Sequence, residues 1–260
     1  MIDFEKAINE LDLELFAQIT SQSTDEDKRS LLACEMAVRE LRSGYNYMEI
    51  GSYLGGSIQP YLLDEKCRRI YSIDKRPASQ PDARGYDWFY LNNSTQRMLE
   101  MLGQVSENIE KITTIDGDTR SIDPAVIADK IQLSFIDGEH TDESVISDFM
   151  FCLRVLDDNG AIVFHDAQIT YNGIAACLRH LDELGVKFRA YVLPHVVFVV
   201  EIGEFPMHKH SKIAELLVDN HIGYLFSLQD NDEYRRFATR FPFGTLRRLG
   251  LKLRGGNVSQ

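Results

Sequence analysis

The stretch NYMEIGSYLGGSIQPYLL, residues 46–63, runs from an apolar segment through glycines and serines into a second apolar segment. The first segment is typical of a buried strand. Gly51 and Gly55 let the backbone approach a ligand closely, and a helix that begins after the turn presents free amide groups to it. We therefore expect a ligand-binding loop at this point of the chain.

The same alternation continues along the sequence. Strand-like apolar runs are followed by polar or glycine-containing turns and then mostly by amphipathic segments; the runs are YMEI, RRIYSID, KITTID, IQLSFID and AIVFHD. This pattern is typical of a parallel sheet with crossover helices. Two further runs, KFRAYVL and HVVFVVEIG, meet across Pro194, which predicts an antiparallel pair at the end of the sheet. The predicted fold is α/β, a seven-stranded, mostly parallel sheet with helices on both faces and an antiparallel last strand.

The chain divides into three expected parts. Residues 1–44 are predicted to be N-terminal helices that form part of the substrate region, with helical spacing over 4–19 and 24–41 and a capping box at Ser23 to Glu26. Residues 45–203 make the sheet domain. Residues 204–260 make a C-terminal helical extension with a basic tail.

Overall composition restricts the class of protein. The chain has 260 residues, of which 44% are hydrophobic and 26% charged, as in ordinary globular proteins. The apolar runs are too short to cross a bilayer and the acidic start does not resemble a secretory signal, so we expect a cytoplasmic protein. A net charge of −12 opposes binding to nucleic acid. Four cysteines without CxxC spacing favour reduced, buried thiols over disulfides.

Basic residues gather at the C-terminal end of the chain. No acid follows Glu233, whereas seven basic residues do: Arg235, Arg236, Arg240, Arg247, Arg248, Lys252 and Arg254. Two interpretations stay open for this tail. It is either a solvated helix end or a docking strip for an anionic partner, a membrane surface or a phosphorylated substrate. A homo-oligomer is a further expectation.

Polar residues close the predicted strands, where an open parallel sheet binds its ligand. Glu49 can accept a hydrogen bond from a cationic amine, and Asp74 is placed to accept the two hydroxyls of a ribose. The turn reads GxxxGG instead of the GxGxxG of dinucleotide enzymes, which disfavours a nicotinamide oxidoreductase. Either motif alone is a common structural feature. Together they favour a nucleoside ligand without a pyrophosphate.

These motifs resemble those of the class I S-adenosylmethionine-dependent methyltransferases, and within them the metal-dependent O-methyltransferases, over about residues 45–200. The catechol-type members share an ExGxYxGxS loop that holds the methionine part of the cofactor, here Glu49, Gly51, Tyr53, Gly55 and Ser57. The resemblance implies a Rossmann-like fold, ribose binding at Asp74 and an adenine pocket lined by Asp118.

A second group of polar residues closes the fourth and fifth predicted strands: Asp137, His140, His165 and Asp166. Their positions at one sheet edge suit a hard or borderline cation, Mg²⁺ or Mn²⁺. The wording FIDGEHTDESVISDF followed by GAIVFHDA resembles the macrocin-type sugar O-methyltransferases. That resemblance implies a metal held by Asp137, His165 and Asp166, with His140 as general base; Asp137 is also expected among the cofactor-binding residues.

One position departs from the family, because His165 stands where the better-known members have a carboxylate, which puts the metal in doubt. The structural alternative is that His165 donates to a neighbouring carboxylate and Asp166 caps the next helix, while His140 is a surface residue.

The expected function is divalent-metal-dependent O-methylation of a hydroxyl on a small molecule or sugar. A metal-independent methyltransferase and a non-catalytic cofactor-binding protein are the alternatives. The substrate region is expected to include the N-terminal helices, the aromatic segment 75–93 and the segment 203–217. Segment 75–93 is either a lid or a packed surface excursion.

Overall fold

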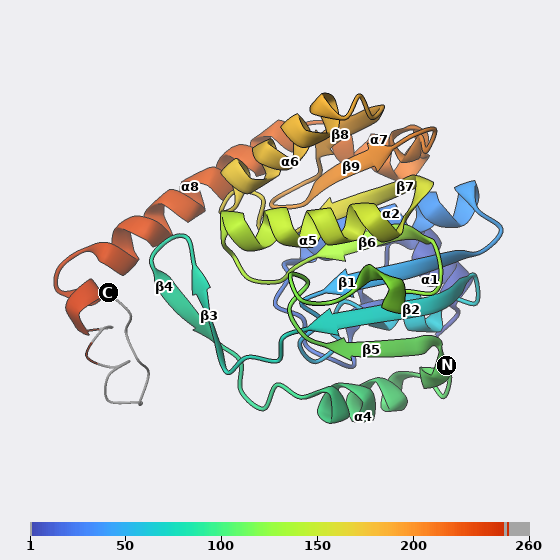
Figure 1. The fold of residues 1–260 in the computed structure, drawn as a ribbon, viewed down its shortest axis with the longest axis horizontal. Helices are drawn as coiled ribbons and strands as arrows, with labels where there is room; N and C mark the ends of the chain where they lie inside the picture. The colour runs from blue at the N-terminus through green and yellow to red at the C-terminus, as the bar shows by residue number, and fades with distance from the viewer. Residues whose placement is uncertain (1, 247–248, 250–260) are drawn as a thin grey trace.

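A seven-stranded sheet forms the centre of the protein in the computed structural model, which describes residues 2–246 and 249 (Figure 1). The strand order is β5-β2-β1-β6-β7-β9-β8. Their bounds are β1 Tyr45–Ile50, β2 Cys67–Asp74, β5 Ile112–Asp116, β6 Ile131–Ile136, β7 Leu156–Phe164, β8 Phe188–Val192 and β9 Phe198–Ile202. Strands β5, β2, β1, β6 and β7 are parallel, whereas β9 runs antiparallel to both β7 and β8. The predicted fold class is confirmed.

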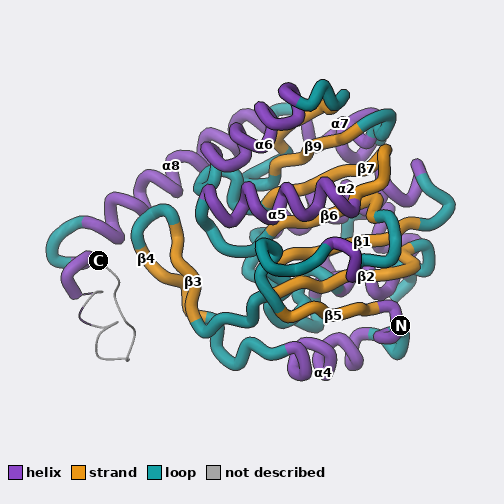
Figure 2. Tube along the Cα trace, in the orientation of Figure 1, coloured by secondary structure: helices purple, strands orange, loops and turns teal. Residues whose placement is uncertain are grey.

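Helices cover both faces of this sheet (Figure 2). The α-helices are α1 Phe4–Glu10, α2 Asp25–Leu41, α3 Gln59–Leu63, α4 Thr95–Val105, α5 Asp142–Val155, α6 Tyr171–Glu183, α7 Ser211–Leu217 and α8 Asn220–Thr239. Short 3-10 helices lie at Leu13–Phe16, Ile109–Lys111, Pro124–Val126 and Met207–Lys209. In the described part of the chain, no helix combines the length and the apolar character needed to cross a membrane.

Successive residues of β1 enter two separate hydrophobic clusters, because side chains alternate between the faces of a strand. Tyr47 packs with α2 and α3 on one face, where its ring stacks on Tyr61 at 3.6 Å between centroids. Met48 packs in the cluster on the other face with Phe149 of α5. The four cysteines are buried and free, as the sequence predicted.

The register of the parallel strands brings their carboxyl ends to one edge. Ile50, the last residue of β1, pairs with Ile73 of β2 and with Ile136 of β6, and Ile136 pairs with Phe164 of β7. The residues that follow these four, including Asp137 and His165, therefore lie side by side.

The N-terminal segment differs in detail from the expected pair of helices. The first helix ends at Glu10, because Leu11 adopts a left-handed conformation with φ 52°. The capping box of α2 consists of Thr24 and Asp27, one residue later than Ser23 and Glu26. Asp27 accepts hydrogen bonds from Thr24 N at 3.1 Å and from Val196 N at 3.2 Å, so it both caps α2 and ties the helix to the segment before β9.

Segment 75–93 contains an antiparallel hairpin of β3 Ser79–Asp82 and β4 Tyr86–Phe89. The hairpin projects from the edge toward which the arrowheads of β2 and β5 point, and α8 passes beside it (Figure 1). The guanidinium of Arg84 lies 4.8 Å from the ring centroid of Tyr234 on α8. Four residues of the predicted basic tail, Arg247, Arg248, Lys252 and Arg254, lie outside the described residues.

Candidate active site

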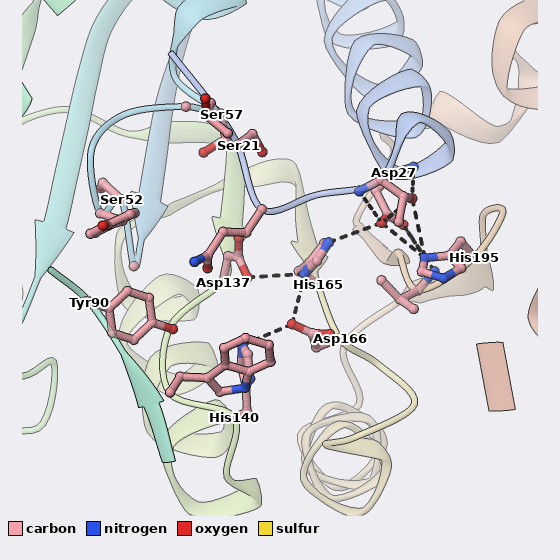
Figure 3. Close-up of a pocket in the computed structure, with 18 of the residues that line it drawn as sticks. Ser21, Asp27, Ser52, Ser57, Tyr90, Asp137, His140, His165, Asp166 and His195 are labelled. Atoms are coloured by element: carbon pink, nitrogen blue, oxygen red, sulfur yellow. Dashed lines mark hydrogen bonds and ion pairs between the residues drawn. The ribbon is translucent and has the colours of Figure 1, made fainter. Parts of the chain in front are cut away.

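A cavity of about 490 Å³ opens at the carboxyl edge of the sheet. Its walls come from the loop after β1, the ends of β6 and β7, the hairpin, α8, and two segments far apart in sequence around Asp27 and His195 (Figure 3). The lining residues include Asp27, Gly51, Tyr53, Ser57, Arg84, Trp88, Tyr90, Asp137, His140, His165, Asp166, His195 and Tyr234.

The loop after β1 is held close against the end of β6. Gly51 adopts φ +93°, and a Cβ at this position would lie 2.1 Å from the carbonyl oxygen of Asp137. The amide of Asp137 donates to the carbonyl of Ile50 at 2.9 Å. Only glycine fits this contact, so the sequence motif and the end of the fourth parallel strand form one backbone unit.

Glu49 lies beneath this loop and is fully buried. Its carboxylate accepts hydrogen bonds from the Tyr47 hydroxyl and from Ser57 Oγ, both at 2.6 Å. Burial raises the pKa of Glu49 to about 7, although these two donors oppose the rise. A cationic group nearby would favour the ionised carboxylate.

Asp74 closes β2 on the opposite side of the loop. Its carboxylate accepts hydrogen bonds from the amides of Tyr53 at 2.8 Å and Arg76 at 2.6 Å, which fixes its orientation. A small hollow adjoins it, and Gly117 and Thr119 line that hollow together with Asp74.

Asp118, expected in the adenine pocket, is held differently from its neighbours. Its carboxylate forms ion pairs with Lys75 at 2.9 Å and Arg120 at 2.7 Å, and these cations hold its pKa well below the usual range. The structure therefore brings Glu49, Gly51 and Asp74 to one loop, while Asp118 sits in a charged cluster beside the hollow.

Four residues at the ends of β6 and β7 form a compact group of carboxylates and imidazoles (Figure 3). His165 Nδ1 lies 3.2 Å from Asp137 Oδ1 and 3.0 Å from Asp166 Oδ2. His140 Nε2 also lies 3.0 Å from Asp166 Oδ2. The predicted group thus converges at one sheet edge, as the register of the strands requires.

The donor set of this group fits a divalent cation. Asp137, His140 and Asp166 each offer a ligand atom within 4.8 Å of the others. Burial opposes a charge on His140, but the carboxylates of Asp166 and Asp82 outweigh it and raise its pKa to about 10. Burial likewise opposes a charge on His165, and Asp137 and Asp166 raise its pKa well above the ordinary value. Protons on the imidazoles balance the carboxylates here, and a cation could take over that role.

This trio contains His140 where the sequence predicted His165, but His165 Nδ1 also lies 3.2 Å from Asp137 and 3.0 Å from Asp166. The second ring nitrogen of His165 faces the buried carboxylate of Asp27 at 3.5 Å. The division of roles between the two histidines stays a prediction.

Two buried carboxylates extend the group at either end, and sequence reasoning missed both. Asp82 of the hairpin lies 3.3 Å from His140 Nδ1 and accepts from Trp88 Nε1 at 3.0 Å. Asp27 lies 3.1 Å from His195 Nδ1. Acids and imidazoles therefore alternate across the cavity. The nearest signal in the sequence was the aromatic run around Trp88; nothing local marked Asp27 or His195.

An aromatic wall faces this polar row. Trp88 and Tyr90 of the hairpin segment and Tyr234 of α8 line the cavity. The Trp88 ring meets His140 edge-on at 6.3 Å between centroids, and the Tyr53 and Tyr90 rings meet at 5.2 Å. Segment 75–93 is thus a wall of the cavity, and its flat rings suit a ring-shaped ligand.

Residues 48–167 match the model of a family described as a methyltransferase domain. An uncharacterized protein of Acanthamoeba polyphaga mimivirus, R132, is 25% identical over 122 residues, which are 47% of this chain and 51% of that protein. The match thus spans about half the length of this curated relative.

Solved methyltransferases share the fold of the chain. The O-methyltransferase NovP aligns with a TM-score of 0.61 at 11% identity over 76% of this chain and 99% of its own. CalS11, a TDP-rhamnose 3′-O-methyltransferase, aligns with a TM-score of 0.51 at 16% identity over 78% and 88%. TomG from Streptomyces achromogenes, solved in complex with SAM, aligns with a TM-score of 0.50 at 12% identity over 78% and 90%. Residues 48–167 thus match a methyltransferase domain, and the chain has the fold that these solved methyltransferases share.

Proposed function

We propose that this protein transfers a methyl group from S-adenosylmethionine to a hydroxyl oxygen of a small molecule or sugar, with a divalent cation, Mg²⁺ or Mn²⁺, held by the carboxylate and imidazole group. The observation that carries the proposal is the backbone contact between Gly51 and Asp137. It joins the loop for the methyl donor to a ligand for the cation, so donor and acceptor meet at one place.

The donor side rests on three groups. Glu49 accepts a hydrogen bond from the amine of the methionine part, and that cation draws the Glu49 pKa down from about 7 toward the ionised state. Asp74 accepts the ribose hydroxyls. The hollow lined by Gly117 and Thr119 receives the adenine. Methyl transfer from a sulfonium is an in-line displacement, so the alignment of donor and acceptor is the main task of these residues.

The acceptor side uses the polar row and the aromatic wall. A cation held by Asp137, His165 and Asp166 would lower the pKa of a coordinated hydroxyl. His140 is the proposed base, and it must be neutral to accept a proton, so its pKa of about 10 has to fall when the carboxylates gain another cationic partner. Trp88 and Tyr90 would stack on the ring that carries the hydroxyl. CalS11, whose fold this chain shares, is a TDP-rhamnose 3′-O-methyltransferase, which supports a sugar acceptor.

The proposed setting is the cytoplasm, which the four free, buried cysteines support.

The test measures binding and turnover separately. Calorimetry with S-adenosylhomocysteine, with and without Mn²⁺ or Mg²⁺ after chelation, is followed by methyl-transfer assays on glycosides and catechols with adjacent hydroxyls. Asp137→Asn should lose cation binding and cation-stimulated turnover, yet bind S-adenosylhomocysteine. Asp182→Asn, an exposed change on α6, is the matched control and should behave as the wild type.

Two results would contradict the proposal in different ways. Full turnover after exhaustive chelation would replace the cation mechanism with catalysis by alignment alone. Tight S-adenosylhomocysteine binding without turnover on any acceptor in the panel would favour a non-catalytic cofactor-binding protein.

A further inference from the structure

Helix α8 carries an exposed apolar face on the side away from the protein. Ile222, Leu225 and Phe226 recur at helical spacing and are 50%, 61% and 61% exposed. Figure 1 shows α8 extending as an arm beyond the sheet. Its inner face is fixed to the body, because Ser227 is buried and Asn231 Nδ2 donates to the carbonyl of Gln168 at 2.9 Å. The outer face is therefore a rigidly held surface that nothing in the described part of the chain covers.

Charges of both signs follow one another on this helix. Acidic Asp230, Asp232 and Glu233 come first, and Arg236 and Arg240 follow; all five are exposed. Asp232 and Arg236 form an ion pair at 2.6 Å within the helix. The surface is thus acidic on one side of Tyr234 and basic on the other.

Such a surface is complementary to itself. When two α8 helices run antiparallel about a two-fold axis near Tyr234, the acidic half of each faces the basic half of the other. Exposed apolar residues lie on both sides of the acidic stretch: Leu225 and Phe226 before it, and the stacked rings of Phe237 and Phe243, which are 59% and 45% exposed, after it. Opposite charges therefore meet across the axis, and apolar residues add to the surface that the pairing would cover.

We propose that two copies of this chain associate through α8, antiparallel, about an axis near Tyr234. An anionic membrane fits the surface less well, because Asp230, Asp232 and Glu233 lie between Leu225 and Phe226 and the arginines and would repel it. A second copy supplies both signs of charge and the apolar contact.

The interface would also reach the candidate active site. Tyr234 lines the cavity, and Arg84 of the hairpin lies over its ring at 4.8 Å. Pairing of α8 therefore holds the wall formed by α8 and the hairpin in place. The association itself does not rest on the proposed reaction, so it can be tested without a substrate.

The experiment uses two charge-reversed forms of the full chain. One carries Asp232→Arg with Glu233→Arg, and the other Arg236→Glu with Arg240→Glu. Both forms lose the ion pair between Asp232 and Arg236, so the effect of that loss on the stability of the helix is the same in each. Mass is measured by light scattering and by sedimentation, and helix content by circular dichroism.

The wild type should have the mass of two chains and dissociate as salt rises. Each reversed form should be a monomer with unchanged helix content, because like charges then meet across the axis. An equal mixture of the two forms should restore a heterodimer, which a merely misfolded variant cannot do. A monomeric wild type, or reversed forms that dimerise alone, would overturn the proposal. Monomers that float with phosphatidylserine vesicles in low salt would instead assign the surface to lipid.

Discussion

Replacing Gly51 by alanine is the most direct test of how the loop after β1 is built. A Cβ at Gly51 would lie 2.1 Å from the carbonyl oxygen and 2.5 Å from the carbonyl carbon of Asp137. Real Cβ contacts do not fall below 3.0 Å, so the two backbones must separate by about 1 Å. No side chain can rotate away to relieve the contact.

The expected loss in the free energy of unfolding has two parts. A non-glycine residue at φ +93° costs about 1–2 kcal/mol in backbone strain, and overpacking costs about another 1–3 kcal/mol. We therefore expect Gly51→Ala to lower the free energy of unfolding by about 2–5 kcal/mol. Because the displaced group is Asp137, the variant should also bind S-adenosylhomocysteine and Mn²⁺ more weakly.

Gly85 in the hairpin provides the matched control. It adopts the same φ of +93°, and among the described residues nothing lies within 4 Å of a Cβ built on it. Gly85→Ala should carry only the strain of about 1–2 kcal/mol. Urea unfolding followed by circular dichroism measures both variants. Equal losses of stability in the two would refute the contact between Gly51 and Asp137.

Three further predictions concern single side chains. Burial raises the pKa of Glu49 from 4.5 to about 7, so the native state binds this proton more tightly than the unfolded state does. The stability that this group contributes should therefore fall by up to about 3 kcal/mol as the pH rises from 4.5 through 7. Urea unfolding of the wild type and of Glu49→Gln across that pH range checks the sign. Asp74→Ala should weaken S-adenosylhomocysteine binding by about 1–3 kcal/mol in calorimetry, and unchanged affinity would remove Asp74 from the donor site. His140→Ala should retain cofactor binding but lose about 10²- to 10⁴-fold in turnover, and a smaller loss would reassign the base.

Local patterns in the sequence predicted the sheet well. Four apolar runs of the sequence became strands β1, β2, β6 and β7, because buried parallel strands have a continuous apolar signal. At the ends of these runs lie Glu49 and Gly51, Asp74, Asp137 and His165. Their convergence followed from the rule that parallel strands share a carboxyl edge. The hairpin was harder to foresee, since Ser79–Asp82 is polar and contains Pro81, and its pairing gives no alternating signal.

Contacts between distant segments could not be predicted. The Asp27 carboxylate meets His195 across 168 residues of chain, and no spacing within either segment marks that contact. The same carboxylate also lies 3.5 Å from the second ring nitrogen of His165, and no local pattern marks that contact either. Where a capping residue is also a buried partner of the site, its local pattern indicates only the cap.

The division of the cavity wall has a consequence for how this protein could change its specificity. The loop after β1 and the ends of β6 and β7 lie inside the segment that matches the methyltransferase domain, residues 48–167. Asp27, His195 and Tyr234 line the same cavity from outside that segment. On the proposed reaction, mutations in these three outer segments should reshape the acceptor wall while the methyl-donor loop keeps its structure. Acceptor specificity and donor binding should therefore be changeable separately by mutation. Chimaeras that exchange only the outer segments should change the acceptor and keep the affinity for the methyl donor.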